Sequence, residues 1–379
     1  METKLLNGNN KEAIAEASKI LQNGGLVAFP TETVYGLGAD ALNADAAAKI
    51  YAAKGRPSDN PLIVHIADTD AVEKLADVET MNRTHPDMVK KAHMLMEAFW
   101  PGPLTIIFPK LAIVPDGTTG GLPTVAIRMP SHPIAQELIR TSGVSIAAPS
   151  ANTSGRPSPT TAQHVWEDMD GRIEMILDGG AVGIGIESTI VDMTGTIPTI
   201  LRPGFITKAM LSEIVGDVTI DPAIIEPDPN LRPKAPGMKY THYAPHGTLS
   251  IVEAAADESA NRASLHSGVK VSYNATEAET LRVAEKIKAL VNEKESQGYK
   301  VAILTTKEHA SLYKNYSHVL IVGEGSKGQT ISARLYAALR ECDSEQMEYM
   351  YSEAFDQNEL GGAIMNRLLK AAGHRVITV

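Results

Sequence analysis

Short apolar runs alternate with amphipathic stretches over residues 1 to about 210. Helical spacing of apolar residues predicts one helix over Asn10–Asn23, ended by Gly24 and Gly25, and a second over Ala44–Lys54, capped by Gly55. Apolar runs bounded by turn residues predict strands over Leu26–Phe29, Leu62–Ile66, Leu104–Phe108, Thr124–Arg128, Val144–Ala148, Ile173–Leu177 and Ser188–Val191. We therefore expect an α/β domain whose sheet has about seven strands.

A proline-rich stretch separates this domain from a second α/β unit. Six prolines lie in residues 221–246, a density typical of an extended, semi-stiff linker. Residues 236–245 are too rich in aromatic and cationic side chains for a passive spacer, although an ordered surface strap would be a simpler explanation. Further along, the pattern predicts helices over Thr276–Glu295, Thr330–Arg340 and Gly361–Ala372, and strands over Val301–Thr305 and Val319–Val322. We predict three parts, residues 1–210, 211–246 and 247–379, the last with a parallel sheet.

Composition narrows the class of protein. The 379 residues are 43% hydrophobic and 21% charged, as in ordinary globular proteins. A net charge of −10 argues against a chain that coats nucleic acid, but leaves room for a local basic pocket. Cys342 is the only cysteine, which excludes an intramolecular disulfide and favours a reducing cytoplasm. The sequence contains neither a membrane-spanning apolar run nor a signal-peptide core.

Common nucleotide and hydrolase motifs are missing from the sequence. There is no P-loop, no HExxH, no GxSxG and no kinase signature. Residues 323–328 read GEGSKG and match the dinucleotide motif GxGxxG between a strand and a helix. No strand with an acidic end follows at the required distance, so a glycine-rich turn is the better interpretation.

The tetrapeptide GRPS occurs twice, at residues 55–58 and 155–158. Glycine and proline make each copy a loop, and each loop carries an arginine, the side chain suited to phosphate. Lys54 directly precedes the first copy, although a lysine there could simply bind the last carbonyls of the helix. Arg56 is held extended by Pro57, so we expect its side chain to be aimed at a ligand.

Polar residues also surround the second copy. Ser150 and Asn152 follow the strand that ends at Pro149, at the strand end where open α/β sheets usually bind ligands. Ser158 is a candidate N-cap for a helix that runs to Met169, with Pro159 as its first residue, and that helix start would favour an anion. Ordinary turn chemistry and simple capping are the alternatives.

Alternation along the strands places polar residues on otherwise apolar surfaces. In Thr124–Arg128, Thr124 and Arg128 share one face. Thr31, Thr33 and Tyr35 would share a face if that segment is extended, and Ser188 precedes an apolar strand. His65 taken alone is at least as well explained as a hydrogen-bonded core histidine. Together these residues predict the floor of a pocket.

With these segments the chain resembles the YrdC-like family of threonylcarbamoyl-AMP synthases, in its long two-domain form. The motifs that carry the resemblance span about residues 10–210 and are Gly25–Asp40, Lys54–Ile66, Phe99–Phe108, Val125–Pro130, Ala148–Thr160 and Leu201–Phe205. The linker PGMKYTHYAP and the trailing α/β unit are similar to the long form. The resemblance implies a twisted mixed sheet with helices, plus a smaller Rossmann-like α/β domain joined by the proline-rich linker.

The resemblance also implies a reaction. Threonine, bicarbonate or CO2, and ATP would give threonylcarbamoyl-AMP and pyrophosphate, with Mg²⁺ expected alongside ATP. A downstream threonylcarbamoyl-transferase complex would then modify an adenosine of tRNA next to the anticodon. The carbamate attacks the α-phosphorus directly, so no enzyme nucleophile is needed, and positioning alone can supply roughly 7–11 kcal/mol.

Roles are carried over from the family motif by motif. The resemblance places threonine on Thr33, His65, Arg128, Ala148 and Ser188. It places ATP on Arg56, Asn60, Thr124, Ser150, Ser158, Arg202 and Tyr243. Lys54 and Asn152 complete a phosphate-facing catalytic group with Arg56 and Ser150. Tyr243 makes the linker a lid, Arg156 is expected to be a variable position that contacts nothing, and no metal ligand is assigned.

Two other functions stay open at this point. A binding module that holds structured RNA on its cationic cluster would need no chemistry, but the net charge weighs against it. A different carbamoyl-transfer enzyme with a YrdC-like fold is the other alternative. Its hydrogenase-maturation relatives carry zinc-binding and acylphosphatase-like segments, and this chain, with a single cysteine, does not resemble them.

Overall fold

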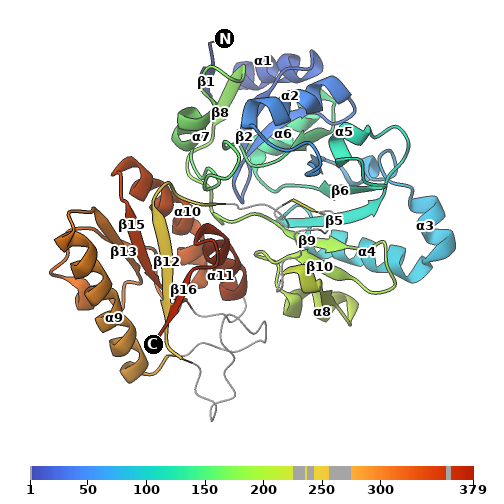
Figure 1. The fold of residues 1–379 in the computed structure, drawn as a ribbon. Coiled ribbons are helices and arrows are strands. Elements are labelled where there is room, and N and C mark those ends of the chain that lie inside the picture. Colours follow the sequence, from blue (N-terminus) through green and yellow to red (C-terminus); the bar gives the residue numbers. More distant parts are fainter. Residues whose placement is uncertain (1, 225–234, 237–242, 256–274, 356–359) are drawn as a thin grey trace. The chain divides into compact units, whose positions relative to one another are not determined.

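The computed structural model describes residues 2–224, 235–236, 243–255, 275–355 and 360–379. It divides into two compact units (Figure 1). Unit 1 comprises Met1–Ser154 with Ser158–Tyr240, and unit 2 comprises Gly155–Pro157 with Thr241–Val379. Much of the predicted linker lies outside the described residues, so the predicted three-part division stays a prediction.

Unit 1 contains an 11-stranded mixed sheet, in the order β1-β8-β2-β3-β7-β4-β6-β5-β9-β10-β11. Its strands are β1 (Lys4–Asn7), β2 (Val27–Pro30), β3 (Tyr35–Asp40), β4 (Ile63–His65), β5 (Leu104–Pro109), β6 (Thr124–Arg128), β7 (Ile146–Ala148), β8 (Met175–Asp178), β9 (Thr189–Asp192), β10 (Thr199–Arg202) and β11 (Thr219–Ile220). The sheet contains parallel pairs such as β4–β6 and antiparallel pairs such as β5–β6.

The sequence predicted about seven strands, and that number was too low. The edge strand β1 is mostly exposed and has no apolar run. Strand β3 was missed because it reads YGLGAD, and glycine is a poor strand residue. A side chain at Gly38 would lie 2.6 Å from Ile146 and 2.7 Å from Phe29. The side chains of the two neighbouring strands, β2 and β7, therefore leave no room for a side chain at this position.

The helices of unit 1 are α1 (Lys11–Gln22), α2 (Ala44–Lys54), α3 (Val78–Thr84), α4 (Pro86–Phe99), α5 (Asp116–Thr119), α6 (Pro133–Ser142), α7 (Ala162–Met169) and α8 (Lys208–Val215). Helix α2 has the predicted bounds. Asn43 caps its start by accepting from two backbone amides, and Gly55 ends it in the left-handed conformation at φ 62°.

Alternate residues of the strands feed two separate cores. On one face, apolar residues of α1 and α6 pack with Val27 and Phe29 of β2 and with Ile146 of β7. On the other face, α2, α4, α7 and α8 pack with Ala28 and Ala147, the intervening residues of the same strands. A third cluster lies farther along the first face, on β4, β5, β6, β9 and β10, and among the described residues only Ala235 joins it from outside these strands.

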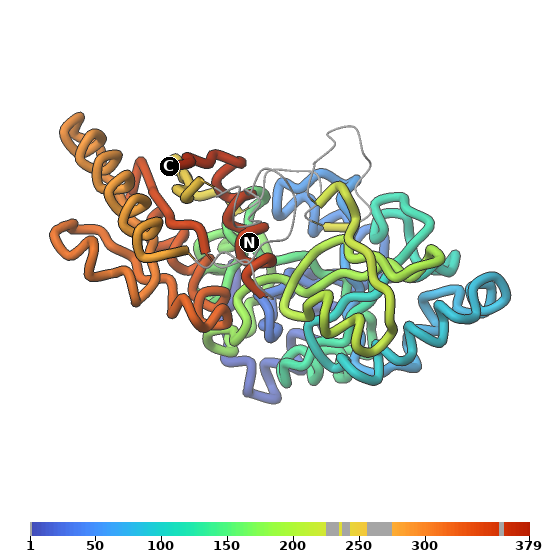
Figure 2. Tube along the Cα trace, turned by 90° about the horizontal axis from the view of Figure 1, so that it is seen from below, coloured from blue at the N-terminus to red at the C-terminus, as the bar shows by residue number. Residues whose placement is uncertain are grey.

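Unit 2 contains a parallel sheet in the order β14-β13-β15-β12-β16. Its elements are β12 (Thr248–Glu253), α9 (Glu277–Ser296), β13 (Val301–Thr305), β14 (Val319–Ile321), α10 (Gly328–Ser344), β15 (Tyr349–Glu353), α11 (Leu360–Ala371) and β16 (Val376–Thr378). Figures 1 and 2 show α9 along one face of this sheet and α10 and α11 along the other. The predicted parallel sheet is confirmed.

The GxGxxG segment of unit 2 forms the turn between β14 and α10. Its Gly325 amide donates to the Glu308 carboxylate at 2.8 Å. A carboxylate of the chain thus takes an amide that a nucleotide phosphate would need. This contact favours a glycine-rich turn over a dinucleotide site.

Candidate active site

The predicted threonine residues of β4, β6 and β7 lie on one face of the large sheet. Strand β4 pairs with β6 so that His65 is opposite Arg128, and Ala148 of β7 is opposite Ile63. The residues between them along these strands face α2 and α4. His65, Arg128 and Ala148 therefore share the opposite face of the sheet. The Phe29 ring, on the same face, meets the His65 ring edge-on at a centroid distance of 6.1 Å.

Arg128 is held on three sides at the end of β6. Its side chain is 4% exposed, and its Nη2 lies 2.7 Å from Glu32 Oε1 in an ion pair. Nη1 donates to Thr33 Oγ1 at 2.9 Å, and Nε donates to the Gly102 carbonyl at 3.3 Å. Two predicted threonine residues, Arg128 and Thr33, are therefore in direct contact.

The segment that carries Thr33 is a turn, so the extended Thr31–Tyr35 segment considered from the sequence is wrong. The Thr31 hydroxyl donates to the Val34 carbonyl at 2.6 Å, which closes the turn between β2 and β3. The Thr31 and Thr33 hydroxyls are 2.8 Å apart. This pairing keeps both polar groups satisfied in a buried position.

His65 is buried beside Arg128. Burial, followed by the Arg128 charge, lowers the pKa of His65 to about 3. Its ring nitrogen Nδ1 lies 3.1 Å from the Ile63 carbonyl, so Nδ1 carries the hydrogen and donates. The imidazole is therefore neutral near pH 7, with Nε2 as the basic nitrogen.

Ser188 connects the predicted threonine residues to the predicted ATP residues. Its hydroxyl is 2.8 Å from Thr105 Oγ1 and accepts from Arg202 Nη2 at 3.1 Å. The Arg202 Nε also donates to the Ser188 carbonyl at 3.0 Å, and its Nη1 donates to the Pro236 carbonyl at 3.4 Å. The two sets of predicted residues thus meet at one buried serine.

Lys54 joins the first GRPS loop to the segment before the second. Its ammonium donates to the Ser150 carbonyl at 2.5 Å and to the Asn152 carbonyl. The Ser150 hydroxyl in turn donates to Asn152 Oδ1 at 2.6 Å. The three predicted residues form one buried or half-buried group. The alternative, in which Lys54 binds the last carbonyls of its own helix, is not what these contacts show.

Arg56 and Asn60 lie in the first loop. Arg56 Nη2 donates to the Pro61 carbonyl at 3.2 Å, and its guanidinium also reaches the Asn60 carbonyl at 3.4 Å. Asn60 is 1% exposed, and its side-chain Oδ1 is buried without a hydrogen-bond partner. Buried polar atoms are almost always paired, so this amide is suited to receive a donor from a ligand.

Ser158 is not the N-cap that the sequence predicted. Helix α7 begins at Ala162 and its N-cap is Thr161, whose hydroxyl accepts from the His164 amide. Ser158 is buried and its hydroxyl donates to Glu187 Oε1 at 2.6 Å. No pattern in the sequence indicated this carboxylate, which lies 29 residues farther along the chain. Thr124, another predicted ATP residue, is half-buried at the start of β6.

Two residues of the prediction belong to unit 2. Tyr243 is buried and its ring stacks on Tyr336 of α10 at a centroid distance of 5.1 Å. Arg156, expected to contact nothing, pairs with Asp343 at 3.4 Å. The repeat of GRPS therefore has two different uses, because the first arginine contacts its own loop and the second an acidic residue of α10.

Comparison with known proteins decides the family. Residues 19–204 match the family model for Sua5, YciO and YrdC, described as telomere recombination. Residues 206–373 match the model described as threonylcarbamoyl-AMP synthase, C-terminal domain. A threonylcarbamoyl-AMP synthase of Bacillus subtilis is 47% identical over 369 residues, which cover 97% of this chain and 95% of that protein. The chain belongs to the threonylcarbamoyl-AMP synthase family.

Two further similarities cover the whole chain. A threonylcarbamoyl-AMP synthase of Pyrococcus abyssi is 41% identical over 376 residues, which cover 98% of each chain. The crystal structure of P. abyssi Sua5 complexed with L-threonine matches with a TM-score of 0.85 and 40% identity, and covers 100% of both chains. The resemblance seen in the sequence, the predicted fold class and the prediction of an enzyme, a nucleotidyltransferase, are thereby confirmed. The individual site residues stay predictions.

Several residues of the candidate site were missed by sequence reasoning. Glu32 pairs with Arg128, Thr105 contacts Ser188, and Glu187 binds Ser158. Asp168 of α7 accepts from the Thr153 amide, next to Asn152, at 3.1 Å. Glu32 and Thr105 lie inside motifs of the resemblance, but no local pattern indicates the partner of any of these four residues, so only the fold could associate each with its partner.

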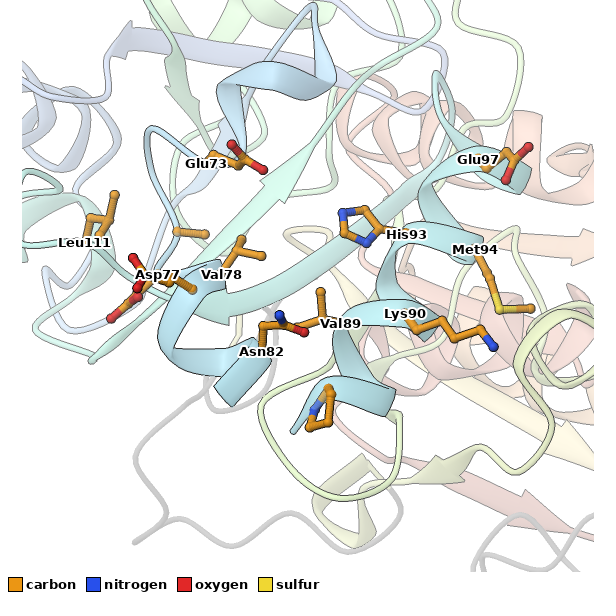
Figure 3. Close-up of a pocket in the computed structure, with 13 residues that line it drawn as sticks. Glu73, Asp77, Val78, Asn82, Val89, Lys90, His93, Met94, Glu97 and Leu111 are labelled. Atoms are coloured by element: carbon orange, nitrogen blue, oxygen red, sulfur yellow. The ribbon is translucent and has the colours of Figure 1, made fainter. Parts of the chain in front are cut away.

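A groove of about 790 Å³ in unit 1 lies apart from all the predicted residues. It runs between α3 and α4 and is lined by acidic and apolar side chains, with Lys90 and His93 on α4 (Figure 3). It belongs to the face covered by α4 and not to the face of the candidate site. Over the described residues, no helix is both long enough and apolar enough to span a membrane.

Proposed function

We propose that this chain forms L-threonylcarbamoyl-AMP and pyrophosphate from L-threonine, bicarbonate or CO2, and ATP. One observation carries the proposal beyond family membership. Ser188, on the threonine side, is hydrogen bonded to Arg202, on the ATP side, at 3.1 Å. A carbamate made on threonine can attack the α-phosphorus of ATP only if the two substrates are adjacent, and this contact makes their proposed subsites neighbours.

The charges of the site fit this pair of substrates. Arg128 would bind the threonine carboxylate through two parallel hydrogen bonds. The neutral His65 next to it adds no second positive charge, and its Nε2 could accept a hydrogen from the threonine amine or hydroxyl. Catalysis in this proposal consists of positioning and charge stabilisation, without an enzyme nucleophile.

ATP would lie along Arg56, Asn60, Thr124, Ser150, Ser158 and Arg202. Arg56 and the Lys54 group would stabilise the negative charge that develops as pyrophosphate leaves. The described part of the linker contacts this region, since the Pro236 carbonyl accepts from Arg202 and Ala235 packs in the cluster on the same face. These contacts support the prediction that this part of the linker lies beside the nucleotide, and the role of Tyr243 in closing over it stays a proposal.

Mg²⁺ would enter with ATP. Among the described residues, no group of three His, Cys, Asp or Glu side chains could hold a metal ion. Proteins usually bind Mg²⁺ through one or two carboxylates plus substrate phosphates. Glu187, in contact with Ser158, is the carboxylate best placed to contribute. When bound, the ion would neutralise charge on the triphosphate.

The product is a reactive mixed anhydride and needs an acceptor. We propose that a threonylcarbamoyl-transferase complex passes its threonylcarbamoyl group to an adenosine of tRNA, in the cytoplasm. The free, buried state of the single cysteine Cys342 is consistent with a reducing compartment.

Pyrophosphate release tests the proposal directly. With full-length protein and Mg²⁺, release should require ATP, threonine and bicarbonate together, and label from ¹³C-bicarbonate should appear in the nucleotide product. Release that does not depend on threonine would overturn it. Salt-dependent RNA binding without any ATP turnover would favour the RNA-binding alternative.

A truncation addresses the role of unit 2. Removing residues 247–379 while keeping the linker should lower ATP affinity if the C-terminal part holds the lid. Unchanged ATP affinity and turnover would assign residues 247–379 to partner binding or dimerisation.

A further inference from the structure

The strongest unassigned contact of the site is the ion pair between Glu32 and Arg128. The two side chains are 14% and 4% exposed, and their atoms are 2.7 Å apart. The second carboxylate oxygen of Glu32 accepts from the Ser131 amide at 3.1 Å. Glu32 therefore joins the guanidinium of Arg128 to the backbone just beyond β6, the strand that carries it.

The turn around Glu32 contacts other predicted threonine residues as well. Thr33 is the next residue and accepts from Arg128. The Glu32 and Thr33 carbonyls accept from the Ile184 and Gly185 amides at 2.9 and 3.0 Å. That segment leads directly to Ser188. The turn thus links three of the five residues predicted to bind threonine.

The contacts of Arg128 leave a specific pair of donors for a ligand. A guanidinium has five N–H groups, and the three contacts with Glu32, Thr33 and Gly102 use one on each nitrogen. Nη1 and Nη2 each keep one N–H that no described contact uses. A carboxylate could accept from one hydrogen on each of these two nitrogens, as in an end-on pair of arginine with a carboxylate.

We propose that Glu32 is a positioning residue that orients the guanidinium of Arg128 for the carboxylate of the amino acid substrate. This inference rests on the proposed function, because it assumes that Arg128 binds threonine. Glu32 itself need not touch the substrate. It acts by holding two nitrogens of Arg128 in the plane that the remaining two donors require.

Positioning and simple charge balance predict opposite effects of Glu32 variants. If Glu32 only neutralised Arg128, removing its charge would strengthen the attraction of Arg128 for a carboxylate. If Glu32 sets the geometry, removing either of its two contacts weakens threonine binding. Glutamine keeps the length and loses the charge, and its amide can accept from Arg128 or from Ser131 but not from both. Aspartate keeps the charge and is too short to span both contacts.

The experiment compares Glu32→Gln, Glu32→Asp and Glu32→Ala in the full-length chain. Threonine binding is measured by calorimetry, and KM for threonine and for ATP by pyrophosphate release. We expect glutamine and aspartate each to weaken threonine binding about tenfold and alanine about a hundredfold, the range for losing a hydrogen bond to a charged group. KM for ATP should change less than about twofold, an effect below 0.5 kcal/mol.

A matched control is Glu353→Gln in unit 2. Glu353 is also a buried carboxylate. It accepts from the Tyr313 and Thr305 hydroxyls, and its other oxygen lies 2.8 Å from His309 Nδ1. Its replacement should lower thermal stability and leave threonine binding unchanged. If the Glu32 variants lower thermal stability but bind threonine like wild type, or if glutamine binds it more tightly, the inference is overturned.

A double-mutant cycle separates this inference from the proposed function. Arg128→Lys removes the guanidinium donors but keeps the charge, so Glu32→Ala should have little further effect in that background. Additive effects would show that Glu32 does not act through Arg128. Failure of the wild-type chain to bind threonine would instead reject the proposed function itself.

Discussion

The Lys54 ammonium lies 2.5 Å from the Ser150 carbonyl oxygen, across 96 residues of sequence. It also donates to the Asn152 carbonyl, and the Ser154 amide donates back to the Lys54 carbonyl at 2.9 Å. The end of α2 and the segment after β7 are therefore one hydrogen-bonded structure. A buried cation that holds two carbonyls fixes the position of Ser150 and Asn152 as well as supplying charge.

Lys54→Met tests the charge and the two hydrogen bonds of Lys54 separately from the size of its side chain. The variant keeps a long side chain but loses the ammonium group that donates to two carbonyls. We expect turnover to fall by about 10²–10³-fold, the scale for losing one charge-stabilising donor. We also expect the free energy of unfolding to fall by about 1–3 kcal/mol, because buried acceptors lose their partner. Pyrophosphate release and urea denaturation measure the two effects.

Lys49→Met is the control for this variant. Lys49 lies on the same helix, and its ammonium also donates to a backbone carbonyl, that of Gly24, at 2.6 Å. It contacts none of the predicted site residues in the described contacts. Turnover should stay within about twofold of wild type. Equal losses in both variants would mean that Lys54 acts through the stability of α2 alone.

Arg56→Ala should act on the nucleotide. Arg56 donates to the Asn60 and Pro61 carbonyls of its own loop, and urea denaturation of the variant checks that the fold stays intact. We expect turnover to fall by about 10²–10³-fold while threonine binding by calorimetry is unchanged. The exposed Arg83 of α3 provides a control. Arg83→Ala removes the same charge at a position well separated in sequence from the predicted site residues. A change in threonine affinity without loss of turnover would contradict the assignment.

Local features of the fold could be predicted well from the sequence. Helix α2 has Asn43 at one end and Gly55 at the other, and strand β6 has a simple alternation of polar and apolar residues. Both elements have their predicted bounds because the signals lie within a few residues of each end. The parallel sheet of unit 2 followed in the same way from alternating strands and helices.

Contacts between distant residues could not be predicted in this way. Glu32 and Arg128 are 96 residues apart, and Thr105 and Ser188 are 83 apart. Glu32 and Ser188 lie outside the strands, and Thr105 lies in β5. The local pattern around a lone acidic or hydroxyl residue does not indicate its partner, which depends on the order of the strands in the sheet. Ser158 failed for a related reason, since a serine before proline suits an N-cap locally, whereas the buried Glu187 carboxylate competes for its hydroxyl.

His65 gives unit 1 a predicted dependence on pH. Its folded pKa of about 3 lies below the ordinary value of about 6.5. Between these values the unfolded chain binds a proton that the folded chain does not, so the stability that neutral His65 contributes above pH 6.5 is lost as pH falls.

We expect the free energy of unfolding to fall by about 1 kcal/mol more in wild type than in His65→Asn between pH 7 and 5.5. Asparagine can keep a donor near the Ile63 carbonyl. Urea denaturation at several pH values measures the difference, and the exposed His93→Asn should behave like wild type. Parallel curves for wild type and His65→Asn would show that His65 is protonated in the folded chain.

Cys342 should report the opening of unit 2. The thiol is buried in α10, and burial, with a further contribution from Asp343, raises its pKa to about 12. The thiolate is the reactive form, so the native chain should resist a thiol reagent at pH 8 and react fully in denaturant. Ser317→Cys, at an exposed turn of the same unit, should react at once. Immediate modification of one thiol per wild-type chain would contradict the buried position of Cys342. If instead the reaction is slow, its rate at increasing urea gives the free energy of opening α10.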